Sequence, residues 1–213
     1  MNRLKIEGSL LQGTLIREPV GNEQGYWAGA PGWVWDEKDQ AAYLCYRIRR
    51  PRGVEPDRGG EVRIAKSTDF ETFEDIWSVH KNAYDSASIE RSTVIRGEDG
   101  QWRYFTSFVA PEDGRWCTSI NKSENLESLD AANARRLFNA NDMDLEGIKD
   151  PWLLEVNDIY HLFLSVAKNT TKTNESSHDS LDIFNTGECK SATALATSPD
   201  LEQWDWQGII LEP

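Results

Sequence analysis

Three stretches of the sequence share one pattern: Ser67-Thr68-Asp69-Phe70-Glu71-Thr72-Phe73, Ser123-Glu124-Asn125-Leu126-Glu127-Ser128-Leu129 and Ser198-Pro199-Asp200-Leu201-Glu202-Gln203-Trp204. Each begins with Ser, places Asp or Asn two positions later and Glu two positions after that, and ends on a large apolar side chain. The first two stretches start 56 residues apart and the last two 75 residues apart. Periods of this size are typical of propellers and other repeat arrays.

The shared motif is expected to form a turn between two strands. Side chains of Ser, Asp and Asn bond to nearby backbone groups and so favour tight turns. The apolar residue that closes each copy, Phe73, Leu129 or Trp204, then packs between or beneath neighbouring sheets. We therefore assign the motif a structural role and no catalytic one.

Runs rich in β-forming residues surround each copy of the motif in the same order. An inner run and an aromatic run come first, separated by a turn such as Glu98-Asp99-Gly100 or Asn157-Asp158, and such pairs indicate hairpins. A third run leads into the Ser motif and a fourth follows it. The predicted inner strands are Gly32–Trp35, Ser92–Arg96 and Trp152–Val156. Four antiparallel strands per repeat make a propeller blade.

The sequence thus predicts an all-β fold: a β-propeller of four-stranded antiparallel blades, with about three blades present. We expect a single domain over residues 1–213, with repeats at approximately 26–80, 88–140 and 147–213. Only Leu126–Leu137 has a helix-like composition, which suits a short turn or an irregular crossing.

Three blades are fewer than the ~4–8 of closed propellers. We therefore expect a truncated propeller, or one half of an assembly. Gly13–Pro19 resembles Gly208–Pro213, so the first of these segments is predicted to supply an outer strand of a further blade.

The chain is acidic, with a net charge of −13. An acidic surface repels phosphate backbones and anionic membranes, so neither nucleic acid nor a membrane is an expected partner, although a local cluster of arginines can still hold an anion. Cys45, Cys117 and Cys189 form an odd set, and the N-terminus has no apolar run typical of a signal peptide, which favours reduced thiols and a cytoplasmic location. No metal-ligand spacing or phosphate loop occurs in the sequence, so no metal and no cofactor is expected.

The third repeat carries Gly147-Ile148-Lys149-Asp150-Pro151-Trp152-Leu153-Leu154, followed by Tyr160-His161-Leu162-Phe163-Leu164-Ser165. This pattern resembles the Asp-Pro motif of five-bladed propeller glycosidases, a group that includes arabinanases, xylosidases and fructosidases of the family 43 and 32 type, and mannoside phosphorylases. The resemblance implies a central funnel that receives carboxylates from the innermost strands of successive blades. It also implies that the three repeats belong to a propeller of five blades.

Catalytic residues follow from the resemblance and the repeat register. Asp150 stands at the Asp of the motif, and Glu90 stands in register with it in the second repeat. Ala30 occupies the corresponding position in the first repeat, where these families place a base or nucleophile. Glycoside cleavage needs one protonated acid and one ionised carboxylate, in environments that separate their pKa values. We assign these roles to Glu90 and Asp150 and expect a third carboxylate from a further blade.

Each catalytic candidate also has a structural interpretation. Glu90 with Arg91 can form a simple ion pair, and Asp150 before Pro151 can be a turn residue at a strand start. Glu188 and Cys189 resemble the fructosidase Glu-Cys acid motif, but they lie outside the expected inner strand.

Four residues are predicted to bind substrate. Arg91 and Lys149 are basic neighbours of the two carboxylates and favour their charged forms. Arg47 belongs to an arginine-rich run that either meets a ligand or lies in a solvated loop. Trp27 is either a platform for stacking a sugar or a plug between blades.

The leading functional hypothesis is a carbohydrate-active propeller, a glycoside hydrolase acting on an oligosaccharide or glycoside. The first alternative is a non-catalytic carbohydrate-binding propeller that lost its base, because Ala30 stands at the usual Asp position. A propeller that serves protein interactions is the second alternative. Fold alone does not decide among these functions.

Overall fold

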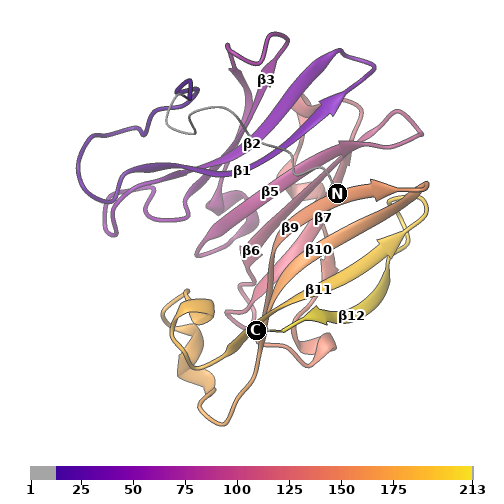
Figure 1. The fold of residues 1–213 in the computed structure, drawn as a ribbon. Coiled ribbons are helices and arrows are strands. Elements are labelled where there is room, and N and C mark those ends of the chain that lie inside the picture. Colours follow the sequence, from indigo (N-terminus) through magenta and orange to yellow (C-terminus); the bar gives the residue numbers. More distant parts are fainter. Residues whose placement is uncertain (1–12, 213) are drawn as a thin grey trace, which may run out of the picture.

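The computed structural model describes residues 13–212, and these residues form twelve strands. In chain order they are β1 (Trp27–Asp36), β2 (Ala41–Arg49), β3 (Glu61–Ser67), β4 (Glu74–His80), β5 (Ile89–Arg96), β6 (Trp102–Val109), β7 (Trp116–Ser123), β8 (Arg135–Phe138), β9 (Gly147–Val156), β10 (Ile159–Lys168), β11 (Lys190–Ser198) and β12 (Asp205–Leu211). They form three antiparallel meanders of four strands, β1–β4, β5–β8 and β9–β12. Figure 1 shows the three meanders fanned from the top of the view to the lower right.

The first strands of the three meanders lie beside one another. Strand β5 contacts both β1 and β9, while β4, β8 and β12 lie at the outer ends of their units. A single parallel bridge between Trp116 and Gly147 links the second and third meanders into one eight-stranded sheet. Each meander is therefore a blade with its first strand innermost, which confirms the predicted all-β propeller architecture.

Aromatic side chains pack the first blade against the second. The rings of Tyr43 and Trp102 meet edge to face at 4.6 Å between centroids, and those of Trp77 and Tyr104 at 5.2 Å. The Trp77 indole also donates a hydrogen bond to the Leu129 carbonyl across the same interface. These pairs combine large apolar contact with directional geometry, which fixes how one blade sits on the next.

Aromatic side chains also pack the second blade against the third, with different residues. The rings of Trp204 and Phe105 meet edge to face with their centroids 5.7 Å apart, and the ring centroids of Trp206 and Phe138 lie 5.1 Å apart. Arg103, which is almost fully buried, ion-pairs with Glu202 of the third blade at 2.6 Å. Trp204 is thus a plug between blades, as its place in the Ser motif predicts.

Two copies of the Ser motif form the same turn. In the first, the Asp69 carboxylate accepts from the backbone N–H groups of Glu71 and Thr72, while Ser67 Oγ accepts from that of Phe70. The third copy repeats these bonds around Ser198 and Asp200.

The second copy of the motif differs from the other two. Asn125 caps a short 3₁₀ helix, Leu126–Ser128, so the prediction of three equivalent turns is wrong here. Leu129 is buried, as expected, and Phe73 and Trp204 are half-buried.

Two further expectations need correction, and one about Leu126–Leu137 is met. The inner strands begin at Trp27, Ile89 and Gly147, three to five residues before the predicted starts, because each contains an irregularity that interrupts the alternation of apolar side chains. The segment Gly13–Pro19 forms no strand. It crosses the first blade, where Arg17 hydrogen-bonds Tyr46 and Asp75 and Ile16 packs on the apolar face. Leu126–Leu137 contains two 3₁₀ turns and β8.

Residues 13–212 include no helix long and apolar enough to cross a membrane. The three cysteines are free thiols, and burial raises the pKa of Cys45 and Cys117 to about 12. These two cysteines therefore serve as small apolar side chains in the core.

Replacing Trp204 with Ala should remove the plug between the second and third blades. Because the side chain is half-buried, we expect a loss of about 3 kcal/mol in the free energy of unfolding, at the low end of the range for large core aromatics. Chemical denaturation measures this loss. Trp33→Ala is the matched control, since Trp33 is 63% exposed, and should cost less than about 1 kcal/mol. Equal losses would contradict the interface described here.

Candidate functional site

The three inner strands carry a β-bulge at the same place. In β1, Ala30-Pro31 together oppose the single residue Tyr46 of β2. In β5, Glu90-Arg91 oppose Ser107, and in β9, Asp150-Pro151 oppose Leu164. An extra residue in one strand re-aims its side chain away from the regular alternation. Ala30, Glu90 and Asp150 are therefore structurally equivalent, on three strands that lie next to one another.

Two of these bulges contain proline after a residue with a left-handed backbone. Ala30 has φ 52° and Asp150 has φ 57°. Proline has no N–H to leave unpaired where the bulge interrupts the ladder. Asp tolerates the left-handed region better than Ala does. The Ala30 bulge thus keeps the geometry of the site without supplying a functional group.

Glu90 forms an ion pair with Arg47 of the first blade. Arg47 is only 5% exposed, and its guanidinium lies over the indole of Trp27, 5.4 Å from the ring centroid. Burial, and then the charge of Arg49, lower the pKa of Arg47 to about 10, so it remains a cation at neutral pH. The contact places the Glu90 carboxylate against a buried guanidinium at the bulge of β5.

Arg91 lies beside Glu90 but makes a different contact. Its guanidinium donates a hydrogen bond of 2.5 Å to the carbonyl of Pro31, in the bulge of β1. Arg91 therefore ties two neighbouring bulges together. The pairing of Glu90 with Arg91, which the sequence suggested, is replaced by the pairing with Arg47, since the two neighbours on β5 point to different partners.

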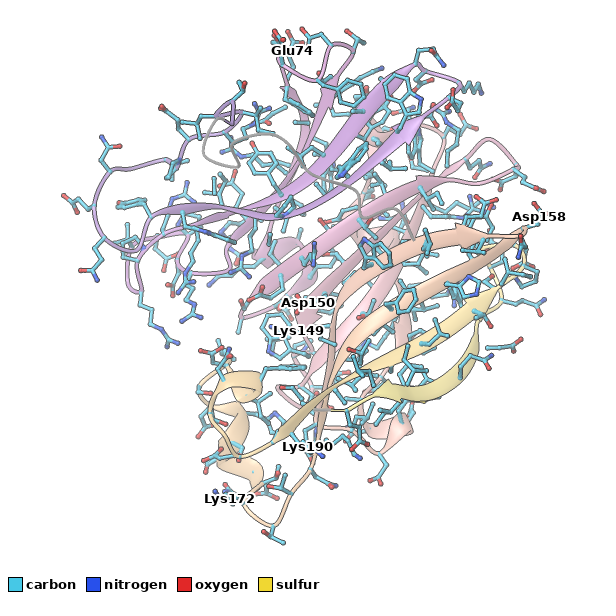
Figure 2. The ribbon with its side chains drawn as sticks, in the orientation of Figure 1. Glu74, Lys149, Asp150, Asp158, Lys172 and Lys190 are labelled. Atoms are coloured by element: carbon cyan, nitrogen blue, oxygen red, sulfur yellow. The ribbon has the colours of Figure 1, made fainter. Side chains whose placement is uncertain are left out.

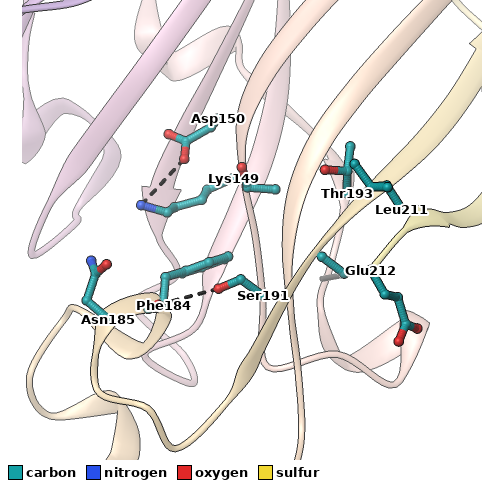
Figure 3. Close-up of a pocket in the computed structure, with 10 residues that line it drawn as sticks. Lys149, Asp150, Phe184, Asn185, Ser191, Thr193, Leu211 and Glu212 are labelled. Carbon is teal, nitrogen blue, oxygen red and sulfur yellow. Dashed lines mark hydrogen bonds and ion pairs between the residues drawn. The ribbon is translucent and has the colours of Figure 1, made fainter.

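Asp150 lines an open cavity of ≈ 550 Å³ on the third blade. Lys149 Nζ lies 3.5 Å from its carboxylate and also faces the rings of Phe184 and Trp116, at 4.7 and 5.4 Å from their centroids. The Asp150 backbone N–H donates to Ser107 Oγ at 3.0 Å, which fixes the bulge against the second blade. Figure 3 shows Lys149 and Asp150 above Phe184, with Thr193 and Glu212 on the far wall.

The two carboxylates line neighbouring pockets instead of one. Glu90 belongs to a smaller pocket with Arg58 and Ser180, whereas Asp150 shares its cavity with Phe184 and Asn185. The segment 180–185 thus contributes residues to both pockets. An ion pair of 3.4 Å between Arg58 and Asp182 joins this segment to the first blade.

The long loop after β10 is anchored at its base. His178 Nε2 lies 3.0 Å from the Glu146 carboxylate, which also pairs with Arg115. His178 is thus held inside the loop and is half-buried. Glu188 and Cys189 lie in the same loop, where the Glu188 carbonyl accepts from Thr170 and Thr173.

Sequence analysis missed the contributions of Arg58, Asp182 and Phe184 to the site. All three lie on loops, and the ion pair between Arg58 and Asp182 joins residues 124 positions apart. The available indication was the length of the loop after β10, because loops of that length are commonly functional. Among residues 13–212 we find no cluster of three or more side chains able to hold a metal ion.

Known structures share this architecture. A family 117 glycoside hydrolase from the marine bacterium Zobellia galactanivorans aligns with a TM-score of 0.59 at 10% identity, over 92% of this chain and 60% of that chain. A bifunctional GH43-CE protein of Bacteroides eggerthii aligns with a TM-score of 0.58 at 11% identity, over 92% of this chain and 22% of that chain. A β-fructofuranosidase of Schwanniomyces occidentalis aligns with a TM-score of 0.55 at 12% identity, over 93% of this chain and 36% of that chain.

At these identities the alignments establish the fold, and they confirm the predicted resemblance to propeller glycoside hydrolases at that level. The chain spans between 22% and 60% of the length of these three proteins. No protein-family model and no curated protein matches the sequence.

Arg47 and Glu90 should be energetically coupled, because removing either one leaves the other charge partly buried and unpaired. A double-mutant cycle with Arg47→Met and Glu90→Gln should give a coupling free energy of about 2 kcal/mol in thermal or chemical denaturation. The control cycle uses Arg136→Met and Glu112→Gln, an exposed pair on the second blade, which should couple by less than about 1 kcal/mol. A coupling near zero for the first pair would refute this organisation of the site.

Proposed function

We propose that the chain forms the core of a carbohydrate-active propeller that hydrolyses glycosidic bonds, with Glu90 and Asp150 among its carboxylates. The observation that carries the proposal is the equivalence of the bulges, since Glu90 and Asp150 occupy the same position on adjacent inner strands. Each carboxylate has its own cation, Arg47 or Lys149, and each borders a pocket. The similarity of fold to glycoside hydrolases supports the same class of chemistry.

The ion pairs suggest which role each carboxylate plays. Glycoside cleavage passes through a sugar ring that carries positive charge, and an ionised carboxylate stabilises that charge or activates water. Because cations face both Glu90 and Asp150, we assign the two to these ionised roles. The proton for the leaving oxygen then comes from a third acid, which we expect from a further blade.

Trp27 completes the proposed site. Its indole folds back over Gly29, where a Cβ would lie 2.5 Å from the ring, so a larger residue at that position would displace the indole. The ring is 39% exposed. An aromatic face of this kind stacks on the apolar C–H face of a sugar, which is the role we propose for Trp27.

A second candidate function rests on Ala30. A methyl group neither moves a proton nor attacks carbon, and it stands at the bulge of β1 where Glu90 and Asp150 stand in the other blades. If that missing carboxylate was the essential base, the protein binds carbohydrate and does not cleave it.

Asp150→Asn separates the two candidates because it keeps the shape of the side chain and removes its charge. Hydrolysis of a panel of aryl glycosides should fall by about 10²-fold or more, the usual contribution of an acid–base group. Affinity for the same sugars, measured by titration calorimetry, should stay within about threefold, since the hydrogen-bonding shape of the site is kept.

Asp158→Asn is the matched control. Asp158 also has a left-handed backbone, φ 62°, but lies at the exposed tip of the β9–β10 hairpin, far from Asp150 in Figure 2. It should leave both activity and affinity unchanged. Full activity of Asp150→Asn would refute the catalytic role, and an inactive wild type that binds oligosaccharides would establish the second candidate.

A further inference from the structure

Four arginines lie close together in and near the Glu90 pocket, on a chain whose net charge is −13. Arg47 and Arg49 lie at the end of β2, and Arg52 and Arg58 lie in the loop that follows it. Arg52 and Arg58 line the pocket directly. We call these four residues the arginine patch.

The guanidinium groups of the patch are close enough to repel one another. Burial lowers the pKa of Arg49 most, and the positive charges of Arg58 and Arg52 lower it further. The negative charge of Asp182 acts in the opposite direction and raises it. The positive charges of Arg49 and Arg58 likewise lower the pKa of Arg47. Placing like charges together in this way costs stability unless an anion offsets them.

Carboxylates of the chain offset only part of this charge. Glu90 is paired with Arg47, and Asp182 with Arg58. Arg49 and Arg52 form no ion pair with any residue in the described part of the chain. Two guanidinium groups are therefore available to a ligand beside the pocket.

The surroundings of the patch suit a sugar better than a bare ion. Arg49 pairs across the strands with Trp27, so the guanidinium and the exposed indole lie on the same face of the first blade. Ser88 and Ser180 line the pocket with hydroxyl groups. An aromatic face, hydroxyls and a planar cation together match a ring that carries both hydroxyls and a negative group.

We propose that the arginine patch recognises the anionic substituent of a sugar, a carboxylate or a phosphate, held by Arg49 and Arg52 beside the small Glu90 pocket while the ring lies outside that pocket against Trp27. The guanidinium fork matches both groups, because each presents two oxygens that accept parallel hydrogen bonds. The proposal deepens the proposed function and rests on it for the sugar, whereas the anion preference rests on the arginine patch alone.

Titration calorimetry with paired sugars tests the proposal. Each hexuronate and each sugar phosphate in a panel is compared with its neutral parent sugar, and inorganic phosphate is measured alone. We expect one charged class to bind at least about tenfold more tightly than its neutral parent, which also identifies carboxylate or phosphate as the source. Arg49→Gln should lower that preference about tenfold and leave neutral sugars within about twofold.

Arg50→Gln is the control, because Arg50 is adjacent in sequence but already paired with Glu61 at 3.2 Å. It should leave the preference intact. Equal affinity for charged and neutral sugars would overturn the proposal. So would a loss of preference in Arg50→Gln as large as in Arg49→Gln. Inorganic phosphate that binds as tightly as any sugar phosphate, while no uronate binds, would also overturn it.

The outcome also separates this proposal from the proposed function. Cleavage of neutral glycosides that depends on Asp150, without any anion preference, would leave the function standing and refute the arginine patch as a binding site. Charged sugars that bind through Arg49, together with a wild type that cleaves no aryl glycoside, neutral or charged, would support the patch and refute the hydrolase.

Discussion

The position of one extra residue in each inner strand controls the candidate site. A strand without a bulge would send alternate side chains to its two faces, and residues 30, 90 and 150 would follow that alternation. With the bulge, each residue leaves the ladder at the corresponding register position, and the contacts of β5 with β1 and β9 place the three bulges on adjacent strands. Packing between the blades keeps these strands adjacent, so the site depends on interfaces built by residues such as Trp102 and Trp204.

Local patterns made most of the fold predictable. Strand alternation, hairpin turns and the Ser motif depend on residues close in sequence, and the turns at Ser67 and Ser198 form as their side-chain chemistry requires. The true starts of the inner strands were not predictable in the same way, because a bulge breaks the period of two on which strand recognition rests. The second Ser motif failed for a local reason, since Asn125 caps a 3₁₀ turn in place of the shared bonds.

The partners of the site residues were less accessible to sequence analysis. Alignment of the repeats placed Ala30, Glu90 and Asp150 in register, and the bulges agree with that register. Which cation faces each carboxylate depends on how the blades pack. Glu90 lies beside Arg91 in the sequence yet pairs with Arg47 from another blade.

A bulge by itself is no evidence of chemistry, and Ala30 demonstrates this. That strand keeps the bulge and its left-handed residue although the side chain is a methyl group, which is poorly suited to that conformation. The propeller therefore uses the bulge as part of its architecture, whatever side chain stands there. What distinguishes Glu90 and Asp150 is the cation beside each of them, since a charge at the edge of a pocket loses solvation when a sugar covers it. In the proposed function, Arg47 and Lys149 would offset that loss, because each places a cation against one of the two carboxylates.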